Sequence, residues 1–239
     1  MALLEVSELS KRFGGVKALE SVSFSVEEGA IVGLIGPNGA GKTTLFNLVA
    51  GTFRPDAGRI VFGRVDIAGL PANAVCRQGI ARTFQITRPF AAMTCIENVG
   101  VALVNSPRTE DRSHWQPRAL AYLNVVGLGD LAGQEAGRLN VVQKKRLEIA
   151  RALATSPRLL LLDEVLGGLN SQEILQSVAF IRTLRDEHHL TVFWIEHVMG
   201  AIMGAADKVI VLDQGRHLME GVPEDVVKDE RVIQAYLGE

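Results

Sequence analysis

The sequence predicts an α/β fold with a mainly parallel sheet, and three observations lead to this prediction. The segment Gly36–Thr44 has the spacing G-x-x-x-x-G-K-[ST], which is typical of a phosphate-binding loop between a strand and a helix. Strand-like and helix-like segments alternate through the second half of the chain. The length of 239 residues is enough for one large α/β domain or two small ones, and the hydrophobic fraction of 47% is ordinary for a globular protein with a sizeable core.

The composition of the chain bears on its binding partners and on the cellular compartment in which it works. The net charge of −2 gives no reason to expect nucleic acid as a partner. Cys76 and Cys95 match no metal or redox spacing and suit a reducing compartment. We expect no signal peptide, because a basic N-terminal region is missing, and no apolar run approaches the roughly 18–20 residues of a membrane span. The chain is therefore predicted to be soluble when isolated and to reach a membrane only through a partner.

The N-terminal part is predicted to be rich in β-structure, and strands then alternate with helices. Strands are expected near 3–7, 20–26, 30–35, 58–63, 80–84, 158–162, 191–195 and 208–212. Helices are expected near 45–50, 140–154, 171–187 and 223–228. Asn140 is the expected N-cap of its helix. The polar segment 104–118 contains two prolines and is predicted to be a surface loop.

The glycine-rich loop carries the first candidate site. Its residues are Gly36, Pro37, Asn38, Gly39, Ala40, Gly41, Lys42, Thr43 and Thr44. Glycine allows successive backbone N–H groups to surround a phosphate, and the helix that follows directs its positive end at the same point. Lys42 is expected at the β- and γ-phosphates of a nucleotide, and the Thr43 hydroxyl at Mg²⁺. The alternative is a glycine-rich turn that arises by chance.

A second nucleotide feature is the apolar strand that ends in two acids, Leu159–Glu164. Asp163 at the end of that strand could hold Mg²⁺ beside Thr43. Glu164 could then polarise a water molecule that attacks the γ-phosphate. Solvated acids at a strand end are the alternative, and these two motifs alone also allow a P-loop kinase.

Three other residues are weaker candidates individually. Gln85 follows the strand-like segment 80–84, where its amide could contact both Mg²⁺ and the attacking water, although most glutamines are only solvated. His197 follows the strand 191–195, and its imidazole could bind the γ-phosphate, although a single histidine is more often structural. Phe13 could stack on a purine base or could simply belong to the core.

Together these residues resemble the ATP-binding subunit of an ABC transporter. The resemblance runs along nearly the whole chain. It comprises Phe13 (A-loop), Gly36–Thr44 (Walker A), Gln85 (Q-loop), Leu139–Gln143 (signature position), Leu159–Glu164 (Walker B with the catalytic Glu164), Gly167–Asn170 (D-loop) and His197 (switch). It implies one domain over 1–239, in which a P-loop NTPase core carries an antiparallel β subdomain. A helical signature subdomain is expected as an insertion at about 86–157. ATP and Mg²⁺ are the implied cofactors, with Thr43, Gln85 and Asp163 at the metal.

Several strings are similar to the subunits that power branched-chain amino acid importers. They include the segments 11–19, 81–85, 146–153 and 195–197. This similarity implies a second ABC subunit in a homo- or heterodimer, integral membrane permease subunits and, indirectly, a solute-binding protein. It also implies a peripheral position at the cytoplasmic face of the inner membrane.

The chain departs from the family at the signature, which is usually L-S-G-G-Q or L-S-Y-G-Q. Here the residues are Leu139, Asn140, Val141, Val142 and Gln143. In the family this segment binds the γ-phosphate of ATP held by the opposite subunit. A helical backbone would let the Val142 N–H still make that contact, whereas a glycine-only conformation would prevent it. Val165 also replaces the usual proline after Asp-Glu.

Three functions are consistent with these observations. The first is an ATP-hydrolysing subunit of an importer for branched-chain or related amino acids. The second, suggested by Val141 and Val142, is a regulatory module that binds ATP but hydrolyses it weakly. The third is a soluble ABC protein of translation or DNA repair, although such chains usually contain two ATPase halves or a long coiled coil, and this one has neither. The transported solute and the choice between homodimer and heterodimer stay open.

Overall fold

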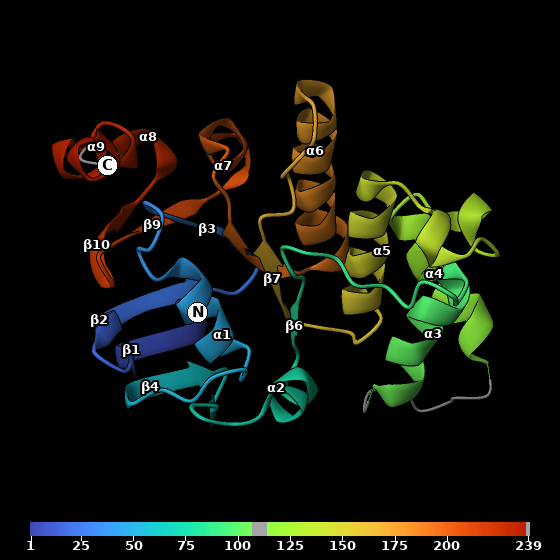
Figure 1. Cartoon of the computed structure of the whole chain (residues 1–239), viewed down its shortest axis with the longest axis horizontal. Helices are drawn as coiled ribbons and strands as arrows, with labels where there is room; N and C mark the ends of the chain where they lie inside the picture. The colour runs from blue at the N-terminus through green and yellow to red at the C-terminus, as the bar shows by residue number, and fades with distance from the viewer. Residues whose placement is uncertain (107–113, 238–239) are drawn as a thin grey trace.

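The strands of this protein form two sheets (Figure 1). The computed structural model describes residues 1–106 and 114–237. The strands are β1 (Ala2–Phe13), β2 (Val16–Glu27), β3 (Ile31–Ile35), β4 (Ala57–Phe62), β5 (Val65–Asp66), β6 (Ile80–Arg82), β7 (Leu159–Asp163), β8 (Thr191–Ile195), β9 (Lys208–Asp213) and β10 (Arg216–Gly221). The α-helices are α1 (Lys42–Val49), α2 (Ala72–Gln78), α3 (Cys95–Asn105), α4 (Trp115–Val125), α5 (Val141–Leu153), α6 (Ser171–His188), α7 (Met199–Ala205), α8 (Pro223–Val226) and α9 (Glu230–Leu237). Short 3₁₀ turns cover Gly129–Leu131 and Ala136–Arg138.

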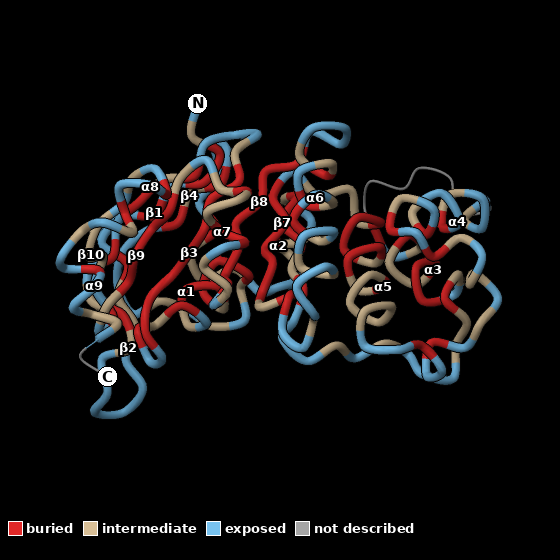
Figure 2. The backbone as a smooth tube through the Cα atoms, turned by 90° about the horizontal axis from the view of Figure 1, so that it is seen from above, coloured by how far each residue is buried: buried red, intermediate tan, exposed pale blue. Residues whose placement is uncertain are grey.

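The larger sheet has the order β10-β9-β3-β8-β7-β6, and β9, β3, β8, β7 and β6 run parallel. Every residue of β3, β7 and β8 is buried, as expected for parallel strands covered on both faces. Figure 2 shows these buried strands as an almost continuous layer through the molecule. The predicted α/β fold is confirmed, and the carboxyl ends of the parallel strands meet at one edge of the sheet.

The smaller sheet is antiparallel, with the order β2-β1-β4-β5, and it confirms the β-rich N-terminal part. Both β1 and β2 are longer than the apolar segments suggested. Alternate residues of β1 such as Leu4 and Val6 are buried in a core shared with Phe46 of α1 and Phe193 of β8. This sheet therefore packs on the α1 side of the parallel sheet.

In the described part of the interval between β6 and β7, the α-helices are α3, α4 and α5. Figure 1 shows them grouped at the far end of the molecule from β1 and β2. They join one apolar core with residues of β7 and α6, including Leu103, Leu123, Leu147 and Leu162. The helical character of the interval agrees with the expectation for 86–157, while its status as a separate inserted subdomain stays a prediction.

The prediction of a surface loop over 104–118 is wrong at both ends of that segment. Residues up to Asn105 belong to α3, and α4 begins at Trp115, while 107–113 lie outside the described residues. The Trp115 ring packs on Gly100 so closely that a Cβ there would lie 2.5 Å from it. Pro117 is tolerated because it stands in the first turn, where the backbone N–H has no partner within the helix.

The strand predicted over 80–84 is shorter than expected. The ladder with β7 ends at the Arg82–Leu161 pair, although the Thr83 N–H still donates to Leu161 O at 2.9 Å. The chain then turns away as Phe84 N–H donates to Glu148 on α5. Within the described ranges, 1–106 and 114–237, no helix is both long and apolar enough to span a bilayer.

Candidate functional site

The glycine-rich loop leaves β3 and enters α1, as its spacing predicts. Two glycines are required by its shape: Gly36 has φ +148° and Gly41 has φ +100°. A Cβ on Gly36 would lie 2.1 Å from the carbonyl oxygen of Leu212, and one on Gly41 would lie 2.6 Å from that of Ala18. Gly41 is the N-cap of α1 and has no side chain, so the first N–H groups of the helix are available to an anion.

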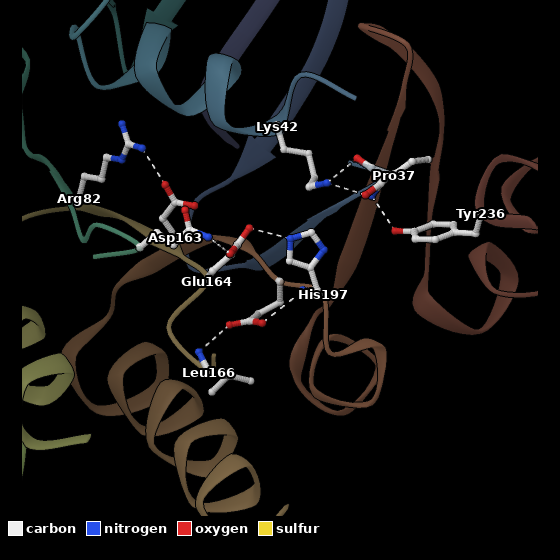
Figure 3. A network of polar contacts seen from close by, with 11 residues as sticks. Pro37, Lys42, Arg82, Asp163, Glu164, Leu166, His197 and Tyr236 are labelled. Atoms are coloured by element: carbon white, nitrogen blue, oxygen red, sulfur yellow. Dashed lines mark hydrogen bonds and ion pairs between the residues drawn. The ribbon is translucent and has the colours of Figure 1, made fainter. Parts of the chain in front are cut away.

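Lys42 is buried within this loop. Its Nζ donates to the carbonyl oxygens of Gly36 at 2.5 Å and Pro37 at 2.8 Å (Figure 3). A buried ammonium group requires such partners, because desolvation is costly for a charge. The arrangement keeps one positive charge in the concave side of the loop, beside the N-terminus of α1. Both features favour a polyanion such as the phosphates of a nucleotide.

The two acids at the end of β7 lie at the edge of the sheet and have different surroundings. Asp163 is buried, and its carboxylate accepts a hydrogen bond from the Arg82 guanidinium at 2.7 Å. Glu164 follows in a left-handed conformation with φ +49°, which is uncommon for a residue with a Cβ. Its backbone N–H donates to Ile195 O at 3.0 Å, which ties this turn to the end of β8.

The carboxylate of Glu164 is the point where two predicted site residues meet (Figure 3). Gln85 Nε2 donates to Glu164 Oε2, and His197 Nε2 lies 2.6 Å from Glu164 Oε1. An ionised carboxylate can only accept, so this contact places a proton on His197 Nε2 when Glu164 is ionised. The structure thus brings together three residues from three strand ends, β6, β7 and β8. The spacing of each motif predicted its strand end but not this contact.

The three residues proposed for Mg²⁺ face one cavity of about 770 Å³, which Thr43, Gln85 and Asp163 all line. Hydroxyl, amide and carboxylate oxygens are the hard donors that Mg²⁺ requires, so the residue types fit. Within the described part of the chain, no cluster of three or more His, Cys, Asp and Glu could hold a metal ion alone. Thr43, Gln85 and Asp163 could hold Mg²⁺ together with phosphate oxygens of a nucleotide.

Arg82 is a site residue that the sequence analysis missed. Its guanidinium donates to Asp163 Oδ2 and to Asn47 Oδ1 of α1, each at 2.7 Å, and lies over the ring of Phe84 at 5.2 Å. The side chains of both Arg82 and Asp163 are nearly inaccessible to solvent. Arg82 therefore orients Asp163 and connects it with α1. The string 81–85 contained this arginine, but nothing in its spacing indicated a contact with β7.

Glu196 is a second residue that the sequence analysis did not select. This buried carboxylate accepts hydrogen bonds from Leu166 N–H at 2.8 Å and from His197 N–H at 3.2 Å. Burial raises the pKa of Glu196 above its ordinary value, and the two backbone donors oppose that shift. From α5, Lys145 Nζ donates to Gly167 O at 2.5 Å. The segment after Glu164 is thus held between the end of β8 and α5.

Phe13 is the last residue of β1 and is 43% exposed. Its ring meets the edge of Phe53 at a centroid distance of 5.3 Å, and Lys11 Nζ lies 5.5 Å from its centroid. The alternative prediction, that Phe13 belongs to the core, is wrong, because its side chain is accessible to solvent. Its stacking on a purine stays a prediction.

The segment Leu139–Gln143 forms the start of α5. Asn140 is the N-cap as predicted: its side chain accepts from Gln143 N–H at 2.9 Å, and Gln143 Oε1 accepts from Asn140 N–H at 3.0 Å. Val141 and Val142 are already in the helix, and neither has positive φ. The backbone here is therefore not a glycine-only conformation. Figure 1 shows α5 on the other side of β7 from α1.

Comparison with known proteins supports the interpretation of these motifs. Residues 19–167 match the family model described as ABC transporter, and residues 216–239 match one described as branched-chain amino acid ATP-binding cassette transporter. The chain is 43% identical to the high-affinity branched-chain amino acid transport ATP-binding protein BraF of Pseudomonas aeruginosa, covering 99% of this chain and 98% of BraF. It is 40% identical to LivG of Escherichia coli K12, a protein of the same description, with the same coverage.

Solved structures agree at the level of the whole chain. A nucleotide-free ATP-binding cassette from an ABC transporter is similar with a TM-score of 0.91 at 31% identity, and all of both chains is covered. The ADP conformation of MJ1267, an ATP-binding cassette of an ABC transporter, is similar with a TM-score of 0.90 at 30% identity, again over all of both chains. The antiparallel sheet, the parallel core and the helical interval are thus the arrangement of a known cassette.

Proposed function

Because this chain belongs to the ABC transporter family, we propose that it binds and hydrolyses ATP as the nucleotide-binding subunit of a branched-chain amino acid importer. The observation that carries the proposal is the convergence of Gln85 and His197 on the Glu164 carboxylate. The relatives BraF and LivG, described as branched-chain amino acid transport ATP-binding proteins, support the solute class.

Each site residue has a role that follows from its position. The loop N–H groups and Lys42 bind the phosphates of ATP. Glu164 accepts a proton from, or polarises, the attacking water, while His197 and Gln85 hold the Glu164 carboxylate in place. Thr43, Asp163 and Gln85 hold Mg²⁺, which when bound neutralises charge on the phosphates. Phe13 stacks on the adenine ring.

A second ABC subunit completes the site in this proposal. The start of α5, where Val141 is 61% exposed, is accessible to a partner and would contact the γ-phosphate of ATP on that second subunit. The helical backbone of Val142 keeps its N–H in the direction of the helix axis, so valine does not prevent this contact.

The permease subunits contact the chain beside β6. Phe84, Ile86 and Phe90 are 55%, 69% and 45% exposed, which is unusual for three large apolar side chains within seven residues. Phe84 and Ile86 line the same cavity as Gln85. A permease segment bound there would contact the Gln85 segment directly, so closure of the ATPase could be transmitted to the membrane. We propose on this basis a peripheral position at the cytoplasmic face of the membrane.

The test uses the assembled transporter in proteoliposomes that contain ATP inside or outside. Replacing Glu164 by Gln keeps the size of the side chain but removes the proton acceptor. We expect ATP hydrolysis and leucine uptake to fall by at least about a hundredfold, with ATP affinity nearly unchanged. The matched control is Glu187→Gln, because Glu187 is exposed on α6, and its hydrolysis and uptake should equal those of the wild type.

The outcomes separate the parts of the proposal. Undiminished hydrolysis by the Glu164→Gln protein would show that the assigned base is wrong. Normal hydrolysis in the wild type without uptake of leucine, isoleucine or valine would contradict the solute class and retain the ATPase.

A further inference from the structure

The C-terminal helix reaches the phosphate-binding loop through one side chain. Tyr236 lies in the last turn of α9, and its hydroxyl oxygen accepts a hydrogen bond from Gly36 N–H at 2.8 Å. The two residues are 200 positions apart in the chain. Figure 3 shows the tyrosine ring directed at the start of the loop, with Tyr236 and Glu164 on opposite sides of Pro37. No role assigned above uses this contact.

The Gly36 N–H needs this acceptor. Gly36 is buried, and a buried N–H without a partner costs more than the hydrogen bond contributes. The residue cannot easily rotate to find another acceptor, because its α-carbon lies against the Leu212 carbonyl of β9. Its own carbonyl oxygen already accepts from Lys42. Gly36 is therefore bonded at its N–H by Tyr236 and at its C=O by the lysine expected to bind phosphate.

The C-terminal part of the chain contacts the same loop at a second point. After β9, the Gly215 N–H donates to Ala40 O at 3.1 Å. Helix α9 itself is held by apolar packing. Val232 of α9 is 3% exposed and belongs to the larger apolar core, and Tyr236 packs against that core. The residues from β9 to α9 thus hold the outer side of the loop at both Gly36 and Ala40.

We infer that Tyr236 is a positioning residue for nucleotide binding, through which α9 holds the phosphate-binding loop in its binding conformation and senses its occupancy. The inference rests on the proposed binding of nucleotide to this loop. A loop that is ordered beforehand does not lose conformational freedom on binding, so the affinity is higher. Because linkage is reciprocal, bound nucleotide must also stabilise the docking of α9.

The test is Tyr236→Phe, which removes only the hydroxyl oxygen. The matched control is Tyr122→Phe in α4, since Tyr122 is the other tyrosine of the chain. We expect the peptide containing Gly36 to exchange its amide hydrogens about tenfold faster in nucleotide-free Tyr236→Phe, and the Kd for ATP to rise about tenfold. The kcat should stay within about twofold of the wild type, since no reacting group has changed. Tyr122→Phe should match the wild type in all three measurements.

A purely structural role would lower the melting temperature and kcat together without a selective change in exchange at the loop. Equal exchange at Gly36 and an equal Kd in the wild type and Tyr236→Phe would overturn the inference. Because exchange at Gly36 is measured without nucleotide, this result does not depend on whether the chain hydrolyses ATP.

Reciprocity supplies a measurement that requires no variant. In the wild type, saturating ATP should slow hydrogen exchange in residues 230–237, whereas the same residues in Tyr236→Phe should respond far less. If ATP binds but leaves exchange in this segment unchanged in the wild type, the sensing part of the inference is wrong. If ATP does not bind at all, it is the proposed function that fails.

Discussion

Glu148 is an ionisable residue placed where its charge is unfavourable. It lies on α5, and its carboxylate accepts from Phe84 N–H at 3.2 Å. Burial raises its pKa from 4.5 to about 7, although that hydrogen bond and the charges of Arg151 and Lys145 act in the opposite direction. Between these two pH values the folded chain binds a proton that the unfolded chain has released. The contribution of Glu148 to stability is thus complete below pH 4.5 and is lost as the pH rises through about 7.

Replacing Glu148 by Gln removes this titration but retains an oxygen that accepts from Phe84. At pH 8 we expect the variant to exceed the wild type in free energy of unfolding by about 2–3 kcal/mol, and at pH 5 by much less. Urea titrations at both pH values measure the difference. Carboxylates with lowered pKa values, such as Asp229, are common to both proteins and cancel. A difference independent of pH would contradict the pKa assigned to Glu148, and Glu187→Gln should show no change at either pH.

At the scale of elements, three helices begin with the same reciprocal cap. Thr94 with Glu97, Asn140 with Gln143, and Asn170 with Glu173 each form a capping box. The caps matter because they set the start of α3, α5 and α6, and α5 begins where the partner's nucleotide is proposed to bind. The first residue of α5 is thus determined locally, and the replacement of signature glycines by Val141 and Val142 leaves the helix start intact.

Asn140→Ala should therefore lower the free energy of unfolding by about 1 kcal/mol. For a chain of this length the melting temperature should fall by about 2–4 °C. Thermal unfolding followed by circular dichroism measures the shift. Asn140→Asp keeps an oxygen that accepts from Gln143 N–H, so it should remain within about 1 °C of the wild type. Equal melting of the alanine and aspartate variants would show that this cap is not what orders the start of α5.

The whole molecule is assembled so that distant segments meet at one edge of the parallel sheet. The loop after β3 (36–44), the acids at the end of β7 (163–164) and the histidine after β8 (197) are far apart in the sequence. Figure 2 shows that the strands β3, β7 and β8, which lead to these residues, are buried along their whole length. A ligand bound at this edge contacts residues that are together only in the folded state, so ligand binding must stabilise the whole fold.

Mg-ATP at about 100 times its Kd should raise the free energy of unfolding by about 2.7 kcal/mol. The melting temperature should then rise by roughly 5–10 °C. Differential scanning fluorimetry measures this shift with and without EDTA, which should reduce it by removing Mg²⁺. Lys42→Ala should lose most of the shift, and the matched control Lys228→Ala, at an exposed position after α8, should retain it. A full shift in Lys42→Ala would mean that nucleotide binds elsewhere.

Local spacing was sufficient to predict where most of the candidate site residues lie in the fold. Gly36–Thr44, Asp163, Glu164 and His197 each follow a strand whose apolar pattern is visible in the sequence, so their common edge could be inferred from the parallel sheet. The failure at 104–118 has a local cause as well. Polar residues and prolines indicated a loop, whereas packing of Trp115 on Gly100 overrides that composition.

The sequence by itself determined the class of fold, the order of the motifs and the candidate phosphate-binding loop, because these depend on short periodic patterns and on the chemistry of few residue types. Only the tertiary structure established that Arg82 holds Asp163, that Glu196 joins Leu166 to His197, and that Tyr236 accepts from Gly36. Arg82 and Asp163 are 81 positions apart in the chain, and Leu166 and Glu196 are 30 apart. Gly36 and Tyr236 are 200 positions apart. No local pattern encodes such a pairing, since it arises only when the sheet brings separate strand ends and α9 to the same edge.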